Sequence, residues 1–240
     1  MENAMRKVVT IQQAVMAEDE KYALRNRQAM SDRKILMVNI IGSPGCGKTT
    51  LLEETAGKAG FSFAVIEGDL ETSRDSERLA AKNIEALQIN TRGGCHLEAH
   101  VVEKALSSLS LGGLDVLFIE NVGNLVCPAE FDLGEDFKVA VSSVPEGSDK
   151  PLKYPMLFAQ AEAVLLTKTD LLPYVRFDRD LFTRDVRSLN PRAPILELNL
   201  ASGEGIGQWI SFISERLKEK RLKADNLKEV HSKGNRADAE

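Results

Sequence analysis

Residues 92–100, RGGCHLEAH, bring together side chains that bind transition metals. Cys95 stands beside His96, and His100 follows four positions later, in a chain that has only 3 cysteines and 3 histidines. A helical pattern that begins at His96 predicts a helix start here, where the helix dipole lowers a thiol pKa and disfavours a protonated imidazole. A metal ion needs a thiolate and a neutral imidazole, and residues four apart share one helix face. The stretch therefore predicts a metal site.

Cys127 is a further candidate ligand, in the segment ENVGNLVCPAE that begins with Glu120. In a parallel α/β sheet, segments that leave the carboxyl ends of different strands gather along one edge, so Cys127 can approach Cys95 and His96. Adjacent residues rarely bind one ion comfortably within one chain, and a symmetric dimer would supply ligands from both subunits. A zinc-protease helix is excluded, because Glu98 would be turned about 200° from His96. Two other interpretations stay open: a buried cysteine with surface histidines, and a nucleophilic Cys/His pair.

A glycine-rich loop, GSPGCGKTT, spans residues 42–50 and completes the pattern G-x-x-x-x-G-K-S/T directly after an apolar run. Glycines let backbone N–H groups surround phosphate oxygens, and the dipole of the following helix adds to the attraction. In this pattern Lys48 reaches the β- and γ-phosphates, and Thr49 binds Mg²⁺. We interpret Cys46 as a small residue that the loop tolerates. The predicted nucleotide-binding residues of the loop are Gly42, Ser43, Pro44, Gly45, Cys46, Gly47, Lys48, Thr49 and Thr50.

The run AVLLTKTDLL indicates which base the nucleotide carries. Its residues Thr167, Lys168 and Asp170 resemble the N-K-x-D element of GTPases, with threonine in the place of the usual asparagine. In that element the lysine stem packs on the purine. The aspartate accepts hydrogen bonds from the guanine N1–H and exocyclic amine, which adenine does not offer. We therefore predict GTP and GDP as ligands, bound in part by Lys168 and Asp170.

Acidic residues near the ends of apolar runs are candidates for binding Mg²⁺ and for positioning water. Glu120 occupies the place of a magnesium-binding carboxylate, and Gly123 completes an E-x-x-G that resembles a switch sensing the γ-phosphate. Asp69 and Asp75, in EGDLETSRDSERL, suit Mg²⁺ or the attacking water, and the sequence does not assign the two roles. Acids at these places also serve only as helix caps or strand ends. The predicted magnesium ligands are Thr49, Asp69, Asp75 and Glu120. The predicted catalytic residues are Lys48, Asp75 and Glu120. Because no arginine finger is identifiable in the sequence, we expect slow hydrolysis.

Seven short apolar runs position these segments. Such runs fit strands buried on both faces, and stretches of helical periodicity separate most of them. This alternation predicts an α/β fold with a doubly wound, mostly parallel sheet of about seven strands flanked by helices. We expect a helical N-terminal extension in residues 1–33, the nucleotide domain in 34–217, and in 218–240 a charged tail in which a helix end runs into disorder. The runs span residues 34–42, 61–68, 86–91, 115–121, 137–143, 161–167 and 193–199.

The amino-acid composition and net charge argue against several classes of function. A chain of 240 residues, with 43% hydrophobic and 28% charged residues, is typical of a soluble α/β domain. The net charge of −5 argues against nucleic acid as a partner, and no apolar run is long enough to span a membrane. Three cysteines are too few for a disulfide scaffold, and the first residues show no apolar signal segment, so we expect a cytoplasmic protein.

Six segments together resemble the HypB family of hydrogenase nickel-incorporation GTPases, which are P-loop NTPases. The specific part of the likeness is the pairing of GGCH with ENVGNLVCP, since the urease accessory GTPase has a single Cys-Pro-His element instead. Residues 1–34 hold no cysteine or histidine, so we expect no nickel-storing motif within them. The six segments, in the family's order between about residues 34 and 213, are GSPGCGKTT, EGDLETSRDSERL, GGCHLEAH, ENVGNLVCP, SVPEGSDKPLKYP and TKTDLLP.

The resemblance implies a cargo metal, partners and further contacts. The implied metal ligands are Cys95, His96 and Cys127, with His100 as a further one, and they would bind Ni²⁺ or Zn²⁺ at or near a GTP-dependent homodimer interface. Nickel would pass to the large-subunit precursor of [NiFe]-hydrogenase, together with the nickel-binding accessory protein HypA. The other implied contacts are the backbone of Ala201 or Ser202 with the base, and Lys150 or Lys153 with the nucleotide of the partner subunit.

Three other functions stay open on the residues alone. A P-loop kinase or ATPase would use the same loop with cysteines that are only structural. A GTP-regulated scaffold would hold a dimer together through structural zinc. A urease-type nickel accessory GTPase shares the loop and the fold. Sulfur and imidazole ligands bind both Ni²⁺ and Zn²⁺, so the sequence does not identify the physiological metal.

Overall fold

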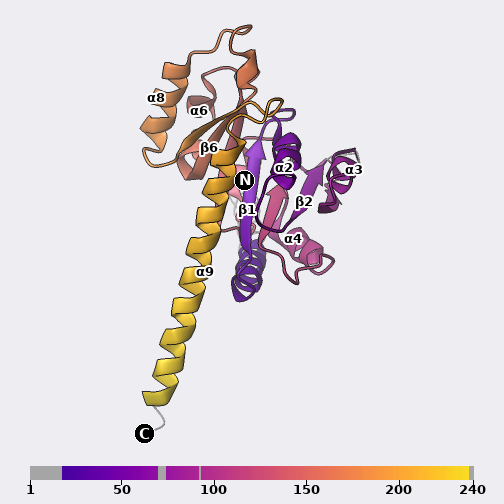
Figure 1. The fold of residues 1–240 in the computed structure, drawn as a ribbon, viewed down its shortest axis with the longest axis vertical. Helices are drawn as coiled ribbons and strands as arrows, with labels where there is room; N and C mark the ends of the chain where they lie inside the picture. The colour runs from indigo at the N-terminus through magenta and orange to yellow at the C-terminus, as the bar shows by residue number, and fades with distance from the viewer. Residues whose placement is uncertain (1–17, 70–73, 92, 238–240) are drawn as a thin grey trace, which may run out of the picture.

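The fold is a seven-stranded sheet between two layers of helices (Figure 1). The computed structural model describes the backbone of residues 18–69, 74–91 and 93–237, and the side chains within these ranges except those of 69, 74–76 and 227–237. All neighbouring strands pair in parallel, in the order β3-β2-β4-β1-β5-β6-β7. The strands are β1 (Leu36–Gly42), β2 (Phe63–Asp69), β3 (Glu85–Asn90), β4 (Val116–Glu120), β5 (Phe137–Ser143), β6 (Ala161–Thr167) and β7 (Ile195–Leu198).

Each predicted apolar run overlaps one of these strands to within two residues at either end, so the predicted doubly wound fold is confirmed. The strand order departs from the chain order around β1, and a ligand crevice forms at the carboxyl end of a strand at such a point. The helices are α2 (Lys48–Ala56), α3 (Arg74–Ala80), α4 (Ala99–Leu106), α5 (Cys127–Glu130), α6 (Lys150–Lys153), α7 (Pro155–Gln160), α8 (Arg179–Leu189) and α9 (Ile206–Ala237), with 3-10 turns η1 (Val144–Glu146) and η2 (Thr169–Leu171).

Alternate side chains of β1 enter different cores, because successive residues of a strand point to opposite faces of the sheet. Val38 and Ile40 pack with α2 and α9 on one face. On the other face, Met37 packs with α4 and the N-terminal helix of residues 18–32, and Ile41 packs with α7 and α8. Burial on both faces explains why β1 is apolar at every position except Asn39 and the final Gly42.

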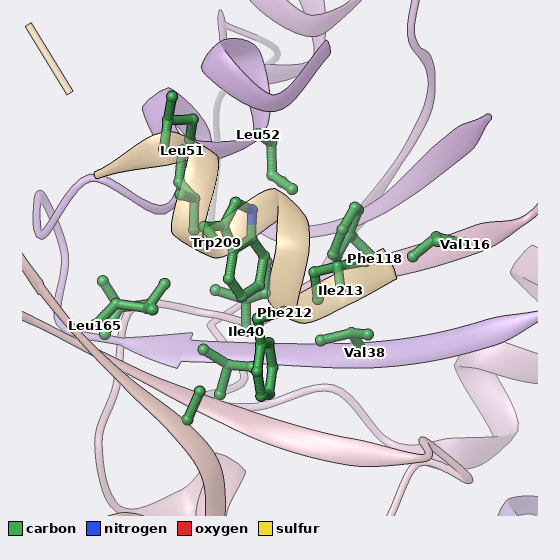
Figure 2. Packing of buried hydrophobic residues seen from close by; sticks show 14 of the residues in the cluster. Val38, Ile40, Leu51, Leu52, Val116, Phe118, Leu165, Trp209, Phe212 and Ile213 are labelled. Carbon is green, nitrogen blue, oxygen red and sulfur yellow. The ribbon is translucent and has the colours of Figure 1, made fainter. Parts of the chain in front are cut away.

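Trp209 of α9 joins that helix to the sheet and to α2 (Figure 2). Its side chain is fully buried, and its ring centroid lies 6.0 Å from that of Phe118 on β4. The indole N–H donates to the hydroxyl of Thr55 on α2 at 3.0 Å, which satisfies the one polar group of the side chain.

Helix α9 is longer than the sequence predicts. It runs on from the core to Ala237, so the tail expected from residue 218 begins inside a helix that extends well beyond the sheet (Figure 1). Lys220 pairs with Asp136 at 2.6 Å, and Asp225 pairs with Lys34, which holds this part of α9 against the globular part. Of the helices in the described part of the chain, none is long and apolar enough to cross a membrane.

We predict that Trp209→Ala lowers the free energy of unfolding by about 3–5 kcal/mol, because it empties a fully buried site. Urea denaturation followed by circular dichroism measures this change. Leu222→Ala is the matched control, since Leu222 lies on the same helix with 64% of its surface exposed, and its effect should stay within about 0.5 kcal/mol. Equal losses in the two variants would contradict the docking of α9 through Trp209.

Candidate nucleotide and metal sites

The loop that follows β1 requires glycine at two positions. A Cβ on Gly42 would lie 2.6 Å from the carbonyl oxygen of Val141 on β5, which is too close for any larger residue. Gly47, just before α2, has a φ of 100°, in the left-handed region that glycine adopts most readily. Gly47 is the N-cap residue and has no side chain with which to cap α2, which suits the first N–H groups of the helix to binding a phosphate.

A cavity of about 370 Å³ lies between this loop and the carboxyl ends of β2 and β4. Lys48 Nζ lies 3.3 Å from the carbonyl oxygens of both Gly42 and Ser43. Thr49 Oγ1 donates to Glu120 Oε1 at 2.8 Å, and a hydroxyl beside a carboxylate provides the oxygen ligands that Mg²⁺ prefers. The structure thus brings together three residues that the sequence analysis selected: Lys48, Thr49 and Glu120.

Gly123 lies directly against the phosphate loop. A Cβ at this position would be 2.9 Å from the backbone nitrogen of Pro44, so glycine permits the approach. Gly123 also lines the cavity, together with Asn121. The predicted E-x-x-G switch therefore begins at the carboxylate bonded to Thr49 and ends in contact with the loop that would hold the phosphates.

Two charged side chains of this cavity were not predicted from the sequence. Glu67 lies beside Glu120 in the register of β2 and β4, with only 2% of its surface exposed. An acid inside an apolar run was the available signal, because such a residue must face a polar cavity to be tolerated. Arg78 of α3 also lines the cavity, and its guanidinium donates to Glu53 at 2.6 Å and to Thr50 at 3.2 Å.

Two predicted acids lie at the margin of the described structure. Asp69 is the last residue of β2, the strand that carries Glu67, and Asp75 belongs to α3, the next element. Their side chains lie outside the described residues. Their roles toward Mg²⁺ and the attacking water therefore stay predictions.

The predicted base-binding residues follow β6. Lys168, whose φ is 58°, directly follows Thr167, and Asp170 comes two residues later. Thr167 lies beside Leu198 of β7 in the sheet register. The buried hydroxyl of Thr167 donates to the carbonyl oxygen of Cys46 in the phosphate loop at 2.5 Å. Threonine in the place of asparagine thus connects the base-binding segment to the phosphate loop.

The loop after β7 adjoins the same region. Leu200 packs near Gly47, where an added Cβ would lie 3.4 Å from Leu200 Cδ1. The backbone N–H groups of Ala201 and Ser202 both donate to Asn199 Oδ1 at 3.2 Å, which fixes the shape of this loop. Contact between Ala201 and a guanine base stays a prediction.

Cys95, His96 and Cys127 come together, although two different connections of the sheet carry them. One donor atom from each lies within 4.8 Å of the others, and Cys95 Sγ is 3.4 Å from His96 Nδ1. Asn124 Nδ2 donates to the carbonyl oxygen of Cys95 at 3.2 Å, and the His96 ring stacks on Phe131 with 3.9 Å between centroids. Two sulfurs and one imidazole at this spacing suit Ni²⁺ or Zn²⁺ and leave a position for a further ligand.

The pKa of the Cys95 thiol differs from the prediction. The hydrogen bond between Cys95 and Cys127 raises the pKa of the Cys95 thiol, whereas a helix start was expected to lower it. The expectation is wrong because α4 begins only at Ala99. Burial lowers the pKa of the His96 imidazole, which favours the neutral form that a metal ion needs, whereas the Cys95 thiol would have to lose its proton to become a ligand.

His100 lies outside this group of donors. Its Nδ1 is 3.0 Å from Glu98 Oε2 and 3.9 Å from Asp19 Oδ1, and the three form a separate cluster at the start of α4. The prediction that His96 and His100 share a helix face is wrong, because His96 precedes the helix.

Lys150 and Lys153 lie on the short helix α6 and pair within their own segment. Lys150 Nζ is 3.6 Å from Glu146 Oε1, and Lys153 Nζ is 2.6 Å from Asp149 Oδ2. A role of either lysine toward the nucleotide of a partner subunit stays a prediction.

Comparison with known proteins finds close relatives of the chain. The family described as CobW/HypB/UreG, nucleotide-binding domain, matches residues 36–197. The chain is 47% identical over 212 residues to the hydrogenase maturation factor HypB of Escherichia coli strain K12, and the match covers 88% of this chain and 73% of that protein. The crystal structure of HypB from Helicobacter pylori in complex with nickel has a TM-score of 0.82 at 38% identity and covers 84% of this chain and 96% of its own. HypB from Archaeoglobus fulgidus has a TM-score of 0.79 at 38% identity and covers 84% of this chain and 100% of its own.

The three cysteines should react differently. Burial raises the pKa of Cys46 to about 11, and only 1% of the residue is exposed, whereas Cys95 and Cys127 are accessible. We predict that Ellman's reagent at pH 8 modifies Cys95 and Cys127 in the folded, metal-free protein and Cys46 only after unfolding, because the reagent reaches the first two thiols, whereas burial both shields Cys46 and disfavours its reactive thiolate. Absorbance of the released aromatic thiolate counts the sites. Rapid reaction in a Cys95→Ala/Cys127→Ala double variant would contradict the burial of Cys46.

Proposed function

The chain belongs to the HypB family of hydrogenase maturation factors, and we propose that it is a GTP-hydrolysing metallochaperone that helps insert nickel into [NiFe]-hydrogenase. One observation carries the proposal: a single short segment, from Glu120 to Cys127, joins the phosphate cavity to the cysteine and histidine donors. Glu120 bonds to Thr49 at one end, and Cys127 lies with Cys95 at the other. A γ-phosphate that shifts this segment would shift a metal ligand with it.

Hydrolysis would depend on positioning and on charge stabilisation. Mg²⁺ held by Thr49 and Glu120 would neutralise charge on the β- and γ-phosphates. Lys48, now beside two loop carbonyls, would turn to the phosphate oxygens, and the N–H groups at the start of α2 would stabilise the charge that develops there. Arg78 is held by Glu53 at the edge of the cavity, which supports a slow intrinsic turnover suited to a switch.

Guanine selectivity would come from the segment after β6. The Thr167 bond to the phosphate loop sets the distance between this segment and the phosphates. Lys168 lines the phosphate cavity, and the exposed Asp170 follows it, so a purine that extends from the cavity would meet both.

Metal transfer would involve a second copy of the chain and further proteins. Three donors leave a tetrahedral or square-planar site incomplete, and a homodimer formed with GTP would complete it. Val126, next to Cys127, has 51% of its surface exposed and offers an apolar contact to such a partner. Nickel would be exchanged with HypA and delivered to the hydrogenase large-subunit precursor. The free cysteines suit a reducing, cytoplasmic setting.

We predict that the protein binds GTP at least about tenfold more tightly than ATP and that Asp170→Asn weakens GTP binding about 10- to 100-fold, because a charge-assisted hydrogen bond is lost. The same variant should gain affinity for xanthosine triphosphate, whose 2-carbonyl accepts from the new amide. Competition with a fluorescent GDP analogue measures all three nucleotides.

Asp180→Asn, at an exposed acid in the first turn of α8, is the matched control and should leave the affinities unchanged. A wild-type preference for ATP would favour the kinase or ATPase alternative instead.

We predict that Ni²⁺ binds with an affinity that differs at least about fivefold between the GDP form and the form with a non-hydrolysable GTP analogue. Titration calorimetry with each nucleotide form measures this ratio. Cys95→Ala and Cys127→Ala should abolish tight binding, whereas His100→Ala should retain it, because the His100 ring lies with Glu98. Equal affinities in the two nucleotide states would refute the coupling.

A further inference from the structure

One buried side chain of the N-terminal helix bonds to both segments that carry the candidate metal ligands. Asn26 Nδ2 donates to the carbonyl oxygen of Ala99 at 2.9 Å and to that of Leu133 at 3.0 Å. Ala99 follows Cys95 and His96 by a few residues, and Leu133 follows Cys127. Only 1% of Asn26 is exposed, so water does not compete with either bond.

Asn26 makes these two bonds at a cost. Its carbonyl oxygen Oδ1 is buried and has no hydrogen-bond partner among the described residues. An unpaired buried acceptor destabilises a fold, and an apolar residue would fill the same position without that cost. The arrangement therefore favours a role in which the two donated bonds matter more than the stability of the helix contact.

The N-terminal helix lies unusually close to the segment after Cys127. A Cβ on Gly134, whose φ is +91°, would lie 2.8 Å from the backbone nitrogen of Arg27. The Arg27 guanidinium donates to both carboxylate oxygens of Asp132 at 2.7 Å. Residues 132–134 are thus held against this helix by backbone contact, by an ion pair and by Asn26.

A second set of buried bonds continues from the same segment to the nucleotide pocket. Leu133 N–H donates to Glu135 Oε2 at 2.7 Å, and Glu135 Oε1 accepts from Asn39 Nδ2 at 3.2 Å. Asn39 Oδ1 in turn accepts from Asn121 Nδ2 at 3.2 Å. The last bond returns to the metal segment, because Asn121 Oδ1 accepts from the N–H of Leu97 at 3.3 Å.

Every side chain of this set is buried: Asn26, Asn39, Asn121 and Glu135. Asn121 follows Glu120 directly and lines the phosphate cavity. Buried hydrogen bonds are strong and directional in a low dielectric, so a displacement of Asn121 is transmitted to its partners. The set therefore links three places: the phosphate cavity, the segment that carries Cys95 and His96, and the segment that follows Cys127.

We propose that Asn26, Asn39, Asn121 and Glu135 are positioning residues, which set the spacing between Cys95–His96 and Cys127 and connect that spacing to the nucleotide pocket. The N-terminal helix then helps to position the metal ligands through Asn26, although it contributes none of the three donors. This inference rests on the proposed function, because it assumes that the three donors bind a transition metal.

Ni²⁺ titration of the full-length Asn26→Ala protein tests the inference, followed by calorimetry and by the nickel–thiolate absorption that reports cysteine ligation. We expect Ni²⁺ affinity to fall about 10- to 100-fold, as it does when residues that orient metal ligands are removed. Affinity for a GTP analogue should change less than about twofold, since Asn26 lies outside the nucleotide pocket. Asn26→Leu is a second variant, which keeps the volume and removes the unpaired oxygen, and it should show the same loss of Ni²⁺ affinity.

Asn190→Ala is the matched control. Asn190 Nδ2 also donates to backbone carbonyls, those of Phe158, Ala159 and Ala161, but between α8 and β6. This variant should keep wild-type Ni²⁺ affinity. Unchanged affinity in both Asn26 variants, or an equal loss in Asn190→Ala, would overturn the inference.

Asn39→Ala tests the connection to the nucleotide. The ratio of Ni²⁺ affinities in the GDP and GTP-analogue forms should move toward 1 in this variant and stay at the wild-type value in Asn190→Ala. A ratio that Asn39→Ala leaves intact would overturn the link to the pocket. Failure of the proposed function gives a different result, because wild-type protein would then bind no Ni²⁺ tightly or would lose none on Cys127→Ala.

Discussion

Burial of β1 on both faces is the constraint on which the other features depend. Because helices cover it on each side, β1 is apolar except at Asn39, whose buried side chain is hydrogen-bonded to Glu135 and Asn121. The exposed polar part of the chain begins where the strand ends. The phosphate loop begins at that end, between the neighbouring strands β4 and β5. Glu120 on β4 and Val141 on β5 then define the two walls of the loop, one by a hydrogen bond to Thr49 and the other by contact with Gly42.

From this strand end, polar side chains connect regions that are remote in sequence. Thr167 joins the base-binding segment to the carbonyl of Cys46, and Asn121 joins the phosphate cavity to Leu97. Both are buried, and each bonds to a backbone group of a loop. Loops held in this way keep a defined shape without regular secondary structure, which a site that responds to a bound phosphate requires.

Local patterns predicted much of this accurately. The seven apolar runs located the seven strands, since alternation and turn residues are properties of short segments. The glycine pattern of residues 42–50 located the phosphate loop for the same reason, and the acid at the end of β4 marked Glu120. Glu67 was missed, because its neighbours made it part of an apolar run, and His100 was placed with His96, because the helix start was set three residues too early.

The sequence by itself determined the strand runs, the phosphate-loop chemistry and the family likeness, because these depend on residues that are close together along the chain. The sequence predicted that Cys127 can approach Cys95 and His96, and the tertiary structure brings the three together. Only the tertiary structure decided that His100 lies with Asp19 and Glu98 and that Asn26 bonds to both ligand segments. These relations depend on strand register and on helix docking, which sum many weak contacts over the whole core. No short stretch of sequence contains that information.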